Sequence, residues 1–265
     1  MNIKNILMFY ILVVITFFQS CQHVKNELNQ EKATNDIEDE KINDSINKQL
    51  IIVLTKDSID TKGYLFRYEL INSEWKKVDK IIDVTIGKNG IANGIGLDLG
   101  FKTKGQDKIE GDGKSPSGVF TIGDAFGFLS TDIVKGIKLN YHHIDSFSRC
   151  IEDDRSKYYN HIVQLDRVDK DWEYADKMRN VDLYEWGFFV NHNSLPVKNA
   201  GSCVFFHIWR APGKYTLGCT AMSKNNIQDL LYWIDPIKKP LIIQYVISDY
   251  EILRKSMEFP DIDLP

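Results

Sequence analysis

A cysteine and a histidine stand twelve positions apart near the end of the chain, at Cys219 and His207. A thiol becomes an effective nucleophile when a neighbouring base accepts its proton, and histidine is the side chain most often used for this. His207 lies in a strongly apolar, strand-like segment, residues 203–210. A histidine in such a strand is also commonly a packed core residue. Spacing alone therefore leaves both interpretations open.

The residues around Cys219 favour a reactive thiol. Gly218 precedes it, and Ser223, four positions later, has the character of a helix N-cap. The free N–H groups and the dipole at a helix N-terminus stabilise a nearby thiolate. A glycine on the other side permits a tight turn and the close approach of a substrate.

The first 20 residues have the pattern of an export signal. Lys4 supplies a positive charge, and an unbroken apolar segment of 13 residues follows at 6–18. A helix that spans a bilayer needs roughly 20 residues, so the shorter length fits the h-region of a secretory signal. Ser20 and Cys21 resemble the end of the lipobox of bacterial lipoproteins, in which the cysteine carries lipid. A plain signal peptide with an incidental Cys21 is the alternative.

Charge and composition exclude a nucleic-acid binder and predict a tether. The 265 residues carry a formal net charge of −4, with both signs interspersed. A basic face that could meet phosphates is therefore not expected. Residues 22–48 lack aromatics and are dense in Asn, Asp, Glu and Lys. Such a stretch cannot bury enough apolar surface to offset its ordering entropy, so 21–49 is predicted to be a lipidated cysteine followed by a disordered tether.

Cys150 and Cys203 are the two cysteines left over from these assignments. In an exported protein the oxidising environment allows them to form a disulfide. Two buried reduced thiols are the alternative. Alkylation of both thiols in the native, non-reduced protein would exclude the bridge.

From Leu50 the sequence predicts a mainly β domain. Short apolar, β-branched runs between turn signals indicate strands, mostly antiparallel, at 50–55, 63–70, 80–90, 118–126, 187–193, 203–210 and 240–247. The charged, aromatic segment 166–186 is expected to be loop and helix. One amphipathic helix is predicted at 224–234, capped by Ser223 and ended by Asp235-Pro236. The tail, 248–265, is expected to extend over the surface.

Four segments together resemble the L,D-transpeptidase catalytic domain, the YkuD-like fold. The main one is HIWRAPGKYTLGCTAMS, in which a strand histidine is followed after a loop by a Gly-Cys turn. The others are Glu110–Phe128, similar to a glycine-rich strand entry, and Cys150–Val163 and Gly87–Gly96, similar to one branch of the family. The resemblance covers residues 50–247. It implies a β-sandwich or barrel-like fold.

The resemblance implies roles for the residues around the thiol. Cys219 would be the nucleophile and His207 the base, acting on peptidoglycan stem peptides without a cofactor or metal. The backbone N–H groups of Gly218, Cys219 and Thr220 would bind the oxyanion. The family commonly carries Arg or Asn two positions after the cysteine, and Ala221 stands there instead.

Three further residues are candidates for the substrate site. Arg210 follows His207 in the loop to Cys219, where its guanidinium can pair with a stem-peptide carboxylate or simply close a surface turn. Asn191 and His192 come at the end of the predicted strand that precedes the His207 strand. One of them can orient His207 through its second ring nitrogen, as the third member of a triad does.

Two rival functions use other residues. A zinc hydrolase would draw ligands from His142, His143, His161 and His192, but no paired spacing of the H-E-x-x-H kind is present. A non-catalytic wall-binding module would use Trp172, Trp186, Trp209 and Trp233 as a sugar platform, although tryptophan at strand positions is more commonly core.

The sequence therefore predicts a lipid-anchored envelope enzyme, on the periplasmic side of the outer membrane. Crosslinking of stem peptides is expected, and trimming by the same cysteine, as an L,D-carboxypeptidase or hydrolase, is the alternative. The sequence specifies no protein partner.

Overall fold

The domain begins with β1 (Gln49–Thr55), where the sequence analysis predicts the first strand. The structure, a computed structural model, describes residues 46–101 and 103–265. The predicted export signal, the lipidation site Cys21 and nearly all of the predicted tether lie outside the described residues. Within them, no helix is long and apolar enough to cross a membrane.

Eight strands close into a barrel. They pair in the order β1, β14, β6, β11, β12, β13, β4 and β2, and β2 pairs back with β1. The pairs β1–β14 and β12–β13 are parallel, whereas the other neighbours in the ring are antiparallel. The bounds are β2 (Lys62–Ile71), β4 (Ile82–Thr85), β6 (Ser115–Gly127), β11 (Trp186–Val190), β12 (Phe205–Ile208), β13 (Thr220–Met222) and β14 (Leu241–Val246).

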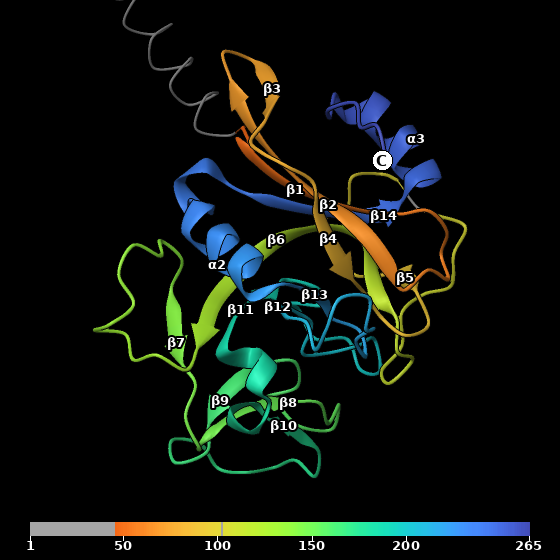
Figure 1. Cartoon of the computed structure of the whole chain (residues 1–265). Helices are drawn as coiled ribbons and strands as arrows, with labels where there is room; N and C mark the ends of the chain where they lie inside the picture. The colour runs from red at the N-terminus through yellow and green to blue at the C-terminus, as the bar shows by residue number, and fades with distance from the viewer. Residues whose placement is uncertain (1–45, 102) are drawn as a thin grey trace, which may run out of the picture. The chain divides into compact units, whose positions relative to one another are not determined.

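Shorter strands extend the barrel at its margins. β3 (Glu74–Lys77) continues β2 as a hairpin, while β5 (Ile91–Asn93) and β7 (Tyr141–His143) pair in parallel with β6. A second, three-stranded sheet has the order β10-β8-β9 and lies beneath the barrel in Figure 1. Its strands are β8 (Ser148–Ile151), β9 (Ile162–Gln164) and β10 (Ala175–Lys177). The prediction of a mainly β, barrel-like domain is confirmed.

β1 shows why the barrel has two apolar layers. All seven of its residues are buried, and successive side chains of a strand point to opposite faces. Ile51 and Val53 join the core shared with α2 (Lys224–Trp233), whereas Leu50, Ile52 and Leu54 join a core on the other face. A strand covered on both faces gives a continuous apolar run rather than an alternating pattern.

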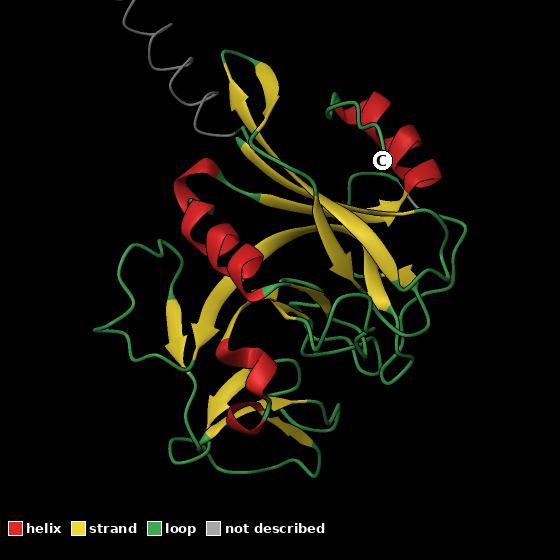
Figure 2. Cartoon of the chain, in the orientation of Figure 1, coloured by secondary structure: helices red, strands yellow, loops and turns green. Residues whose placement is uncertain are grey.

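α2 is the helix predicted after Cys219. Ile227, Leu230 and Leu231 are buried on one side of it, at the i, i+3, i+4 spacing of an amphipathic helix. The Ser223 hydroxyl accepts a hydrogen bond from the Asn226 N–H, which satisfies one free donor of the first turn. The predicted cap and helix are therefore confirmed, and Figure 2 shows α2 alongside the strands.

The expectation of one helix and an extended tail was wrong. The segment after β14 forms a second helix, α3 (Ile247–Met257), which packs on the outer core through Tyr250 and Leu253. Its apolar positions Ile247, Tyr250, Leu253 and Met257 recur at three- and four-residue intervals, a helical pattern that the reading of this segment as a tail missed. Ile262, beyond the helix, is also buried in this core.

The segment 166–186 contains more strand than expected. It forms β10 and two short 3-10 helices, η1 (Met178–Asn180) and η2 (Asp182–Glu185), before β11 begins. A third short helix, η3 (Pro236–Lys238), follows α2. Cys150 of β8 forms a disulfide with Cys203. This bond fastens the small sheet to the chain just before β12.

Candidate active site

Cys219 and His207 are placed by two neighbouring strands. β12 and β13 are parallel, with His207 opposite Ala221. Cys219 precedes β13 and lies two residues before Ala221, and its Sγ accepts a hydrogen bond from the Phe205 N–H at 3.4 Å. Because side chains two residues apart point to the same face, the thiol and the imidazole are diagonal neighbours on one face. No hydrogen bond between the two side chains is found in the described structure.

Two hydroxyl groups hold the turn that carries Cys219. Its backbone carbonyl accepts hydrogen bonds from Thr216 Oγ1 at 2.6 Å and from Ser115 Oγ at 2.9 Å. The Thr216 hydroxyl also accepts from the Gly218 N–H at 3.1 Å. The turn is therefore tied both to its own loop and to the start of β6, which fixes the position of the thiol.

These bonds separate the three expected oxyanion donors. The Gly218 N–H is already bound to Thr216. Thr220 is buried in β13, and its side-chain hydroxyl, as distinct from its backbone N–H, donates to Gln244 Oε1 at 2.7 Å. The Cys219 N–H meets no acceptor among the described residues, so it is free to donate to an oxyanion.

His207 is held in one tautomer by its own strand. Nδ1 donates to the Ile208 carbonyl oxygen at 2.7 Å, which leaves Nε2 as the ring nitrogen that can accept a proton. The Tyr184 ring meets the imidazole edge-on, with centroids 5.3 Å apart. The buried surroundings lower the pKa of His207 to about 4.

The electrostatics around Cys219 keep the thiol protonated. Burial raises its pKa to about 12, and the carboxyls of Asp176 and Glu152 act in the same direction. The Phe205 N–H and the Lys108 ammonium oppose this shift. The resting pair at neutral pH is therefore a thiol and a neutral imidazole. For this thiol to act as a nucleophile its proton would have to move to a base, and Cys219 is partly exposed.

The low pKa values of two buried histidines predict acid sensitivity of the fold. Burial lowers the pKa of both His192 and His207 to about 4, from an ordinary 6.5. The unfolded chain binds more protons between these values, so stability is full above pH 6.5 and falls toward pH 4. The expected loss is about 1.4 kcal/mol per pH unit for each histidine. Urea unfolding across this range measures it. His207→Gln and His192→Gln should each flatten the slope, and an unchanged slope in both would contradict the assignment.

Polar residues from the small sheet and its surroundings border the thiol. The Tyr184 hydroxyl donates to Asp176 Oδ2 at 2.8 Å, and burial raises the pKa of that carboxyl. Glu110, in the loop before β6, accepts hydrogen bonds from Tyr159 and Ser202. These residues come from β10, η2 and three loops. Sequence reasoning gave none of them a role at the site, because their contacts with distant parts of the chain depend on the fold.

Lys108 and Asp112 form a buried ion pair next to the Cys219 turn. Their side chains, 5% and 10% exposed, meet at 2.8 Å. A side chain added at Gly218 would come 3.8 Å from Lys108 Nζ. The Asp112 carboxylate also accepts hydrogen bonds from the N–H groups of Ile109 and Lys114, so it holds together the turn formed by residues 109–114.

The structure does not bring His192 into contact with His207. Its Nδ1 accepts from the Ile95 N–H at 3.1 Å, and its Nε2 donates to the Ala200 carbonyl at 2.9 Å. Both ring nitrogens are thus used to hold backbone segments together, and the side chain is 1% exposed. The expectation that His192 orients His207 or binds substrate finds no support in this geometry, because the Ile208 carbonyl does the orienting.

Asn191 and Arg210 occupy different places. The Asn191 amide donates to Thr121 Oγ1 at 2.8 Å, on β6, and makes no bond to His207. Arg210 is exposed at the start of the loop from β12 to Cys219. Of the three predicted substrate residues, Arg210 is the one that lies on the loop leading to the thiol.

The residues proposed for the rival functions are dispersed. His142 pairs with Asp124 at 2.7 Å, and the His161 ring contacts the Tyr159 carbonyl. No group of three or more potential metal ligands is found among the described residues. Trp172 and Trp186 are buried in the core.

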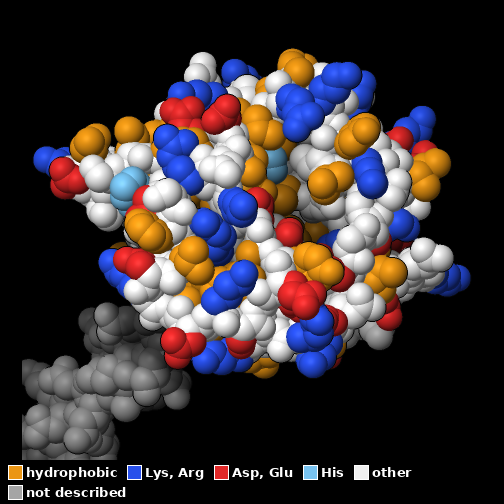
Figure 3. All heavy atoms as spheres, turned by 90° about the horizontal axis from the view of Figure 1, so that it is seen from below, with side chains coloured by type: hydrophobic (Ala, Val, Ile, Leu, Met, Phe, Trp, Pro, Cys, Tyr) orange, Lys and Arg blue, Asp and Glu red, His pale blue; other side chains and the backbone are white. Residues whose placement is uncertain are grey.

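Figure 3 shows one face of the molecule, on which hydrophobic and charged side chains surround a hollow with a histidine inside.

The fold and site define a class: a mainly β barrel protein with a cysteine and a histidine on one face of adjacent parallel strands. No protein-family model and no curated protein sequence matches the chain. Among solved structures, the helical cell shape determining protein Pgp2 from Campylobacter jejuni is similar, with 17% identity and a TM-score of 0.32 over 75% of this chain. The structure of a mutant of that protein is similar with 16% identity and a TM-score of 0.34 over 77% of this chain. The chain spans about half the length of Pgp2, 48% and 52% in the two structures.

Proposed function

We propose that this protein is a cysteine-dependent L,D-transpeptidase that acts on peptidoglycan stem peptides. The observation that carries the proposal is the placement of Cys219 and His207 on one face of β12 and β13, with the Cys219 turn fixed by Thr216 and Ser115. The sequence resemblance to the L,D-transpeptidase domain supplies the substrate class.

The reaction begins with transfer of the Cys219 thiol proton to Nε2 of His207. The sulfur attacks the carbonyl carbon between the L-centre of a diamino acid and a terminal D-amino acid. The oxyanion that forms accepts a hydrogen bond from the Cys219 N–H. His207 then protonates the leaving amine, the D-amino acid departs and a thioester remains.

The second half of the reaction decides the product. When an amine of a neighbouring stem peptide attacks the thioester, a crosslink forms and the thiol is regenerated. When water attacks, the stem peptide is trimmed instead, which is L,D-carboxypeptidase chemistry. Orientation of the amine against competing water determines the outcome. We place the enzyme in the cell envelope, tethered by lipid on Cys21 to the periplasmic side of the outer membrane.

Mass spectrometry of purified muropeptides tests the function. The chain without its export signal is incubated with muropeptides beside its Cys219→Ala variant, with circular dichroism to check that both are folded. Crosslinked dimers formed by the wild type alone support transpeptidation, and shortened monomers support trimming. Identical products from the two proteins would exclude catalysis on these substrates, and retained wall binding without products would favour the binding module.

A further inference from the structure

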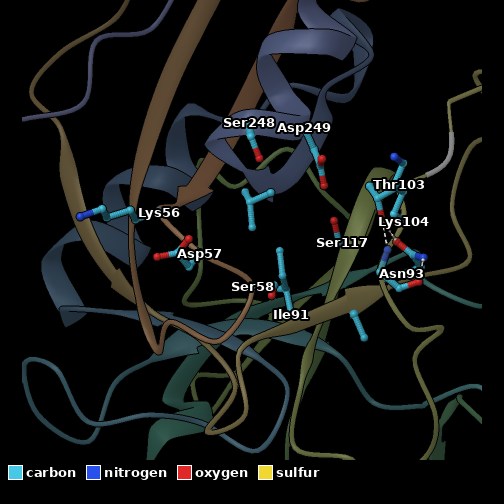
Figure 4. A pocket seen from close by; sticks show the side chains of 13 residues that line it. Lys56, Asp57, Ser58, Ile91, Asn93, Thr103, Lys104, Ser117, Ser248 and Asp249 are labelled. Atoms are coloured by element: carbon cyan, nitrogen blue, oxygen red, sulfur yellow. Dashed lines mark hydrogen bonds between the residues drawn. The ribbon is translucent and has the colours of Figure 1, made fainter.

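One cavity in the described structure lies outside the Cys219 turn. It has a volume of about 350 Å³ and lies between the start of α3, β5, the start of β6 and two loops. Neither Cys219 nor His207 lines it. Figure 4 shows the lining side chains from close by, and those that matter here are Ser117, Ser248 and Asp249.

The Ser117 hydroxyl is an unused polar group in this cavity. Ser117 is 5% exposed, and its Oγ has no hydrogen-bond partner among the described residues. A buried hydroxyl without a partner is costly, and it calls for a group that has not been placed. In Figure 4 the Ser117 oxygen points from β6 toward the start of α3.

Asp249 faces the same space from the first turn of α3. It is partly buried, and no described residue donates a hydrogen bond or offers a salt bridge to its carboxyl. Burial raises the pKa of this carboxyl accordingly. Figure 4 shows Asp249 and Ser248 descending from α3 toward Ser117. Two oxygen-bearing side chains, Ser117 of β6 and Asp249 of α3, therefore face this space without a partner, and the exposed Ser248 also lines it.

We infer that this cavity binds a ligand through a primary ammonium group. An ammonium carries three N–H donors and one positive charge. Ser117 Oγ and Ser248 Oγ accept two of the hydrogen bonds, and the Asp249 carboxylate accepts the third and neutralises the charge. The bound ammonium would give a hydrogen-bond donor to the Ser117 hydroxyl and a positively charged donor to the Asp249 carboxylate.

Other ligand chemistries fit the lining less well. Calcium takes about six to eight oxygen ligands, including several carboxylates, whereas no cluster of three or more potential metal-ligating side chains is found in the described part of the chain. An anion would need cations directed inward. Lys56 and Lys104 are both exposed, and Figure 4 shows the Lys56 amine directed away from the cavity.

The ammonium can come from a small soluble amine or from a free amino group of a muropeptide. The test uses the folded Cys219→Ala chain, so that no turnover occurs and the result is independent of the proposed function. The chain, labelled with ¹⁵N, is titrated with n-butylammonium and with n-butanol of matched shape. A second arm compares a muropeptide that has a free amine with the same muropeptide after N-acetylation.

Amide shifts at Ser117, Ser248 and Asp249 are expected with n-butylammonium and not with n-butanol. Asp249→Asn should weaken binding about tenfold or more, since a charge-assisted hydrogen bond is lost. Asp229→Asn, an exposed carboxyl on α2, should leave the affinity unchanged. Shifts with the free-amine muropeptide as well identify the cell wall as the source, and shifts with butylammonium alone identify a small amine. No shift with either amine, or full affinity in Asp249→Asn, would overturn the inference.

Discussion

His207→Gln should lower turnover of the folded enzyme by at least about 100-fold, the usual contribution of a general base. The thiol has a pKa raised to about 12 and is almost fully protonated at neutral pH. Glutamine cannot accept the proton that Nε2 of His207 accepts. Without that acceptor, only the small fraction of Cys219 present as thiolate can attack the substrate. Steady-state rates on the muropeptide substrate, normalised to the folded fraction, give the measurement.

His192→Gln is the matched control. His192 is also buried, and its pKa is also lowered to about 4, but both of its ring nitrogens bind backbone groups. Its loss should lower stability and leave the turnover of the folded fraction within a few-fold of the wild type. Equal losses of turnover in the two variants would show that His207 acts through the fold rather than on the thiol.

The pair Cys219 and His207 should also be strongly non-additive. Once Cys219→Ala has removed the nucleophile, adding His207→Gln has no proton transfer left to remove. The double variant should therefore be no slower than Cys219→Ala alone.

Raising the pH toward 10 should increase the rate of iodoacetamide labelling of Cys219 in His207→Gln, because hydroxide then generates the thiolate.

The strands could be predicted because their signal is local. Runs such as 50–55 and 203–210 are apolar and β-branched, and they remain strands in the barrel. The α2 cap could be predicted for the same reason, since Ser223 and the helix it caps are adjacent. α3 was not predicted because the separation of its apolar and polar faces is weaker than in α2, although its apolar positions have helical spacing.

The surroundings of the thiol could not be predicted, because they depend on long-range pairing. Tyr184 reaches His207 only after η2 packs against β12. Ser115 reaches the Cys219 carbonyl across 104 positions of sequence. His192 illustrates the reverse error. Its position after a strand suggested a triad member, yet the surrounding loops occupy both of its nitrogens.

Removing the disulfide should destabilise the domain strongly. Cys150 and Cys203 are 53 positions apart in the sequence. Closing a loop of that length reduces the entropy of the unfolded chain by an amount worth about 4 kcal/mol. The Cys150→Ala/Cys203→Ala double variant is therefore expected to lose about 4 kcal/mol of unfolding free energy in urea titrations. A loss below about 1 kcal/mol would contradict this estimate.

The same substitution should lower activity beyond the loss of folded protein, because Cys203 contacts Cys219, the proposed nucleophile. Its carbonyl accepts a weak hydrogen bond from the Cys219 thiol at 3.7 Å, and its N–H donates to Asn160 at 2.9 Å. Cys203 also has a positive φ of 52°, which a non-glycine residue adopts only where its surroundings hold it. Without the bond to β8, the segment entering β12 can relax and move the thiol away from His207. Turnover per folded molecule should therefore fall at temperatures where the variant is still folded, and unchanged turnover there would show that the disulfide serves stability alone.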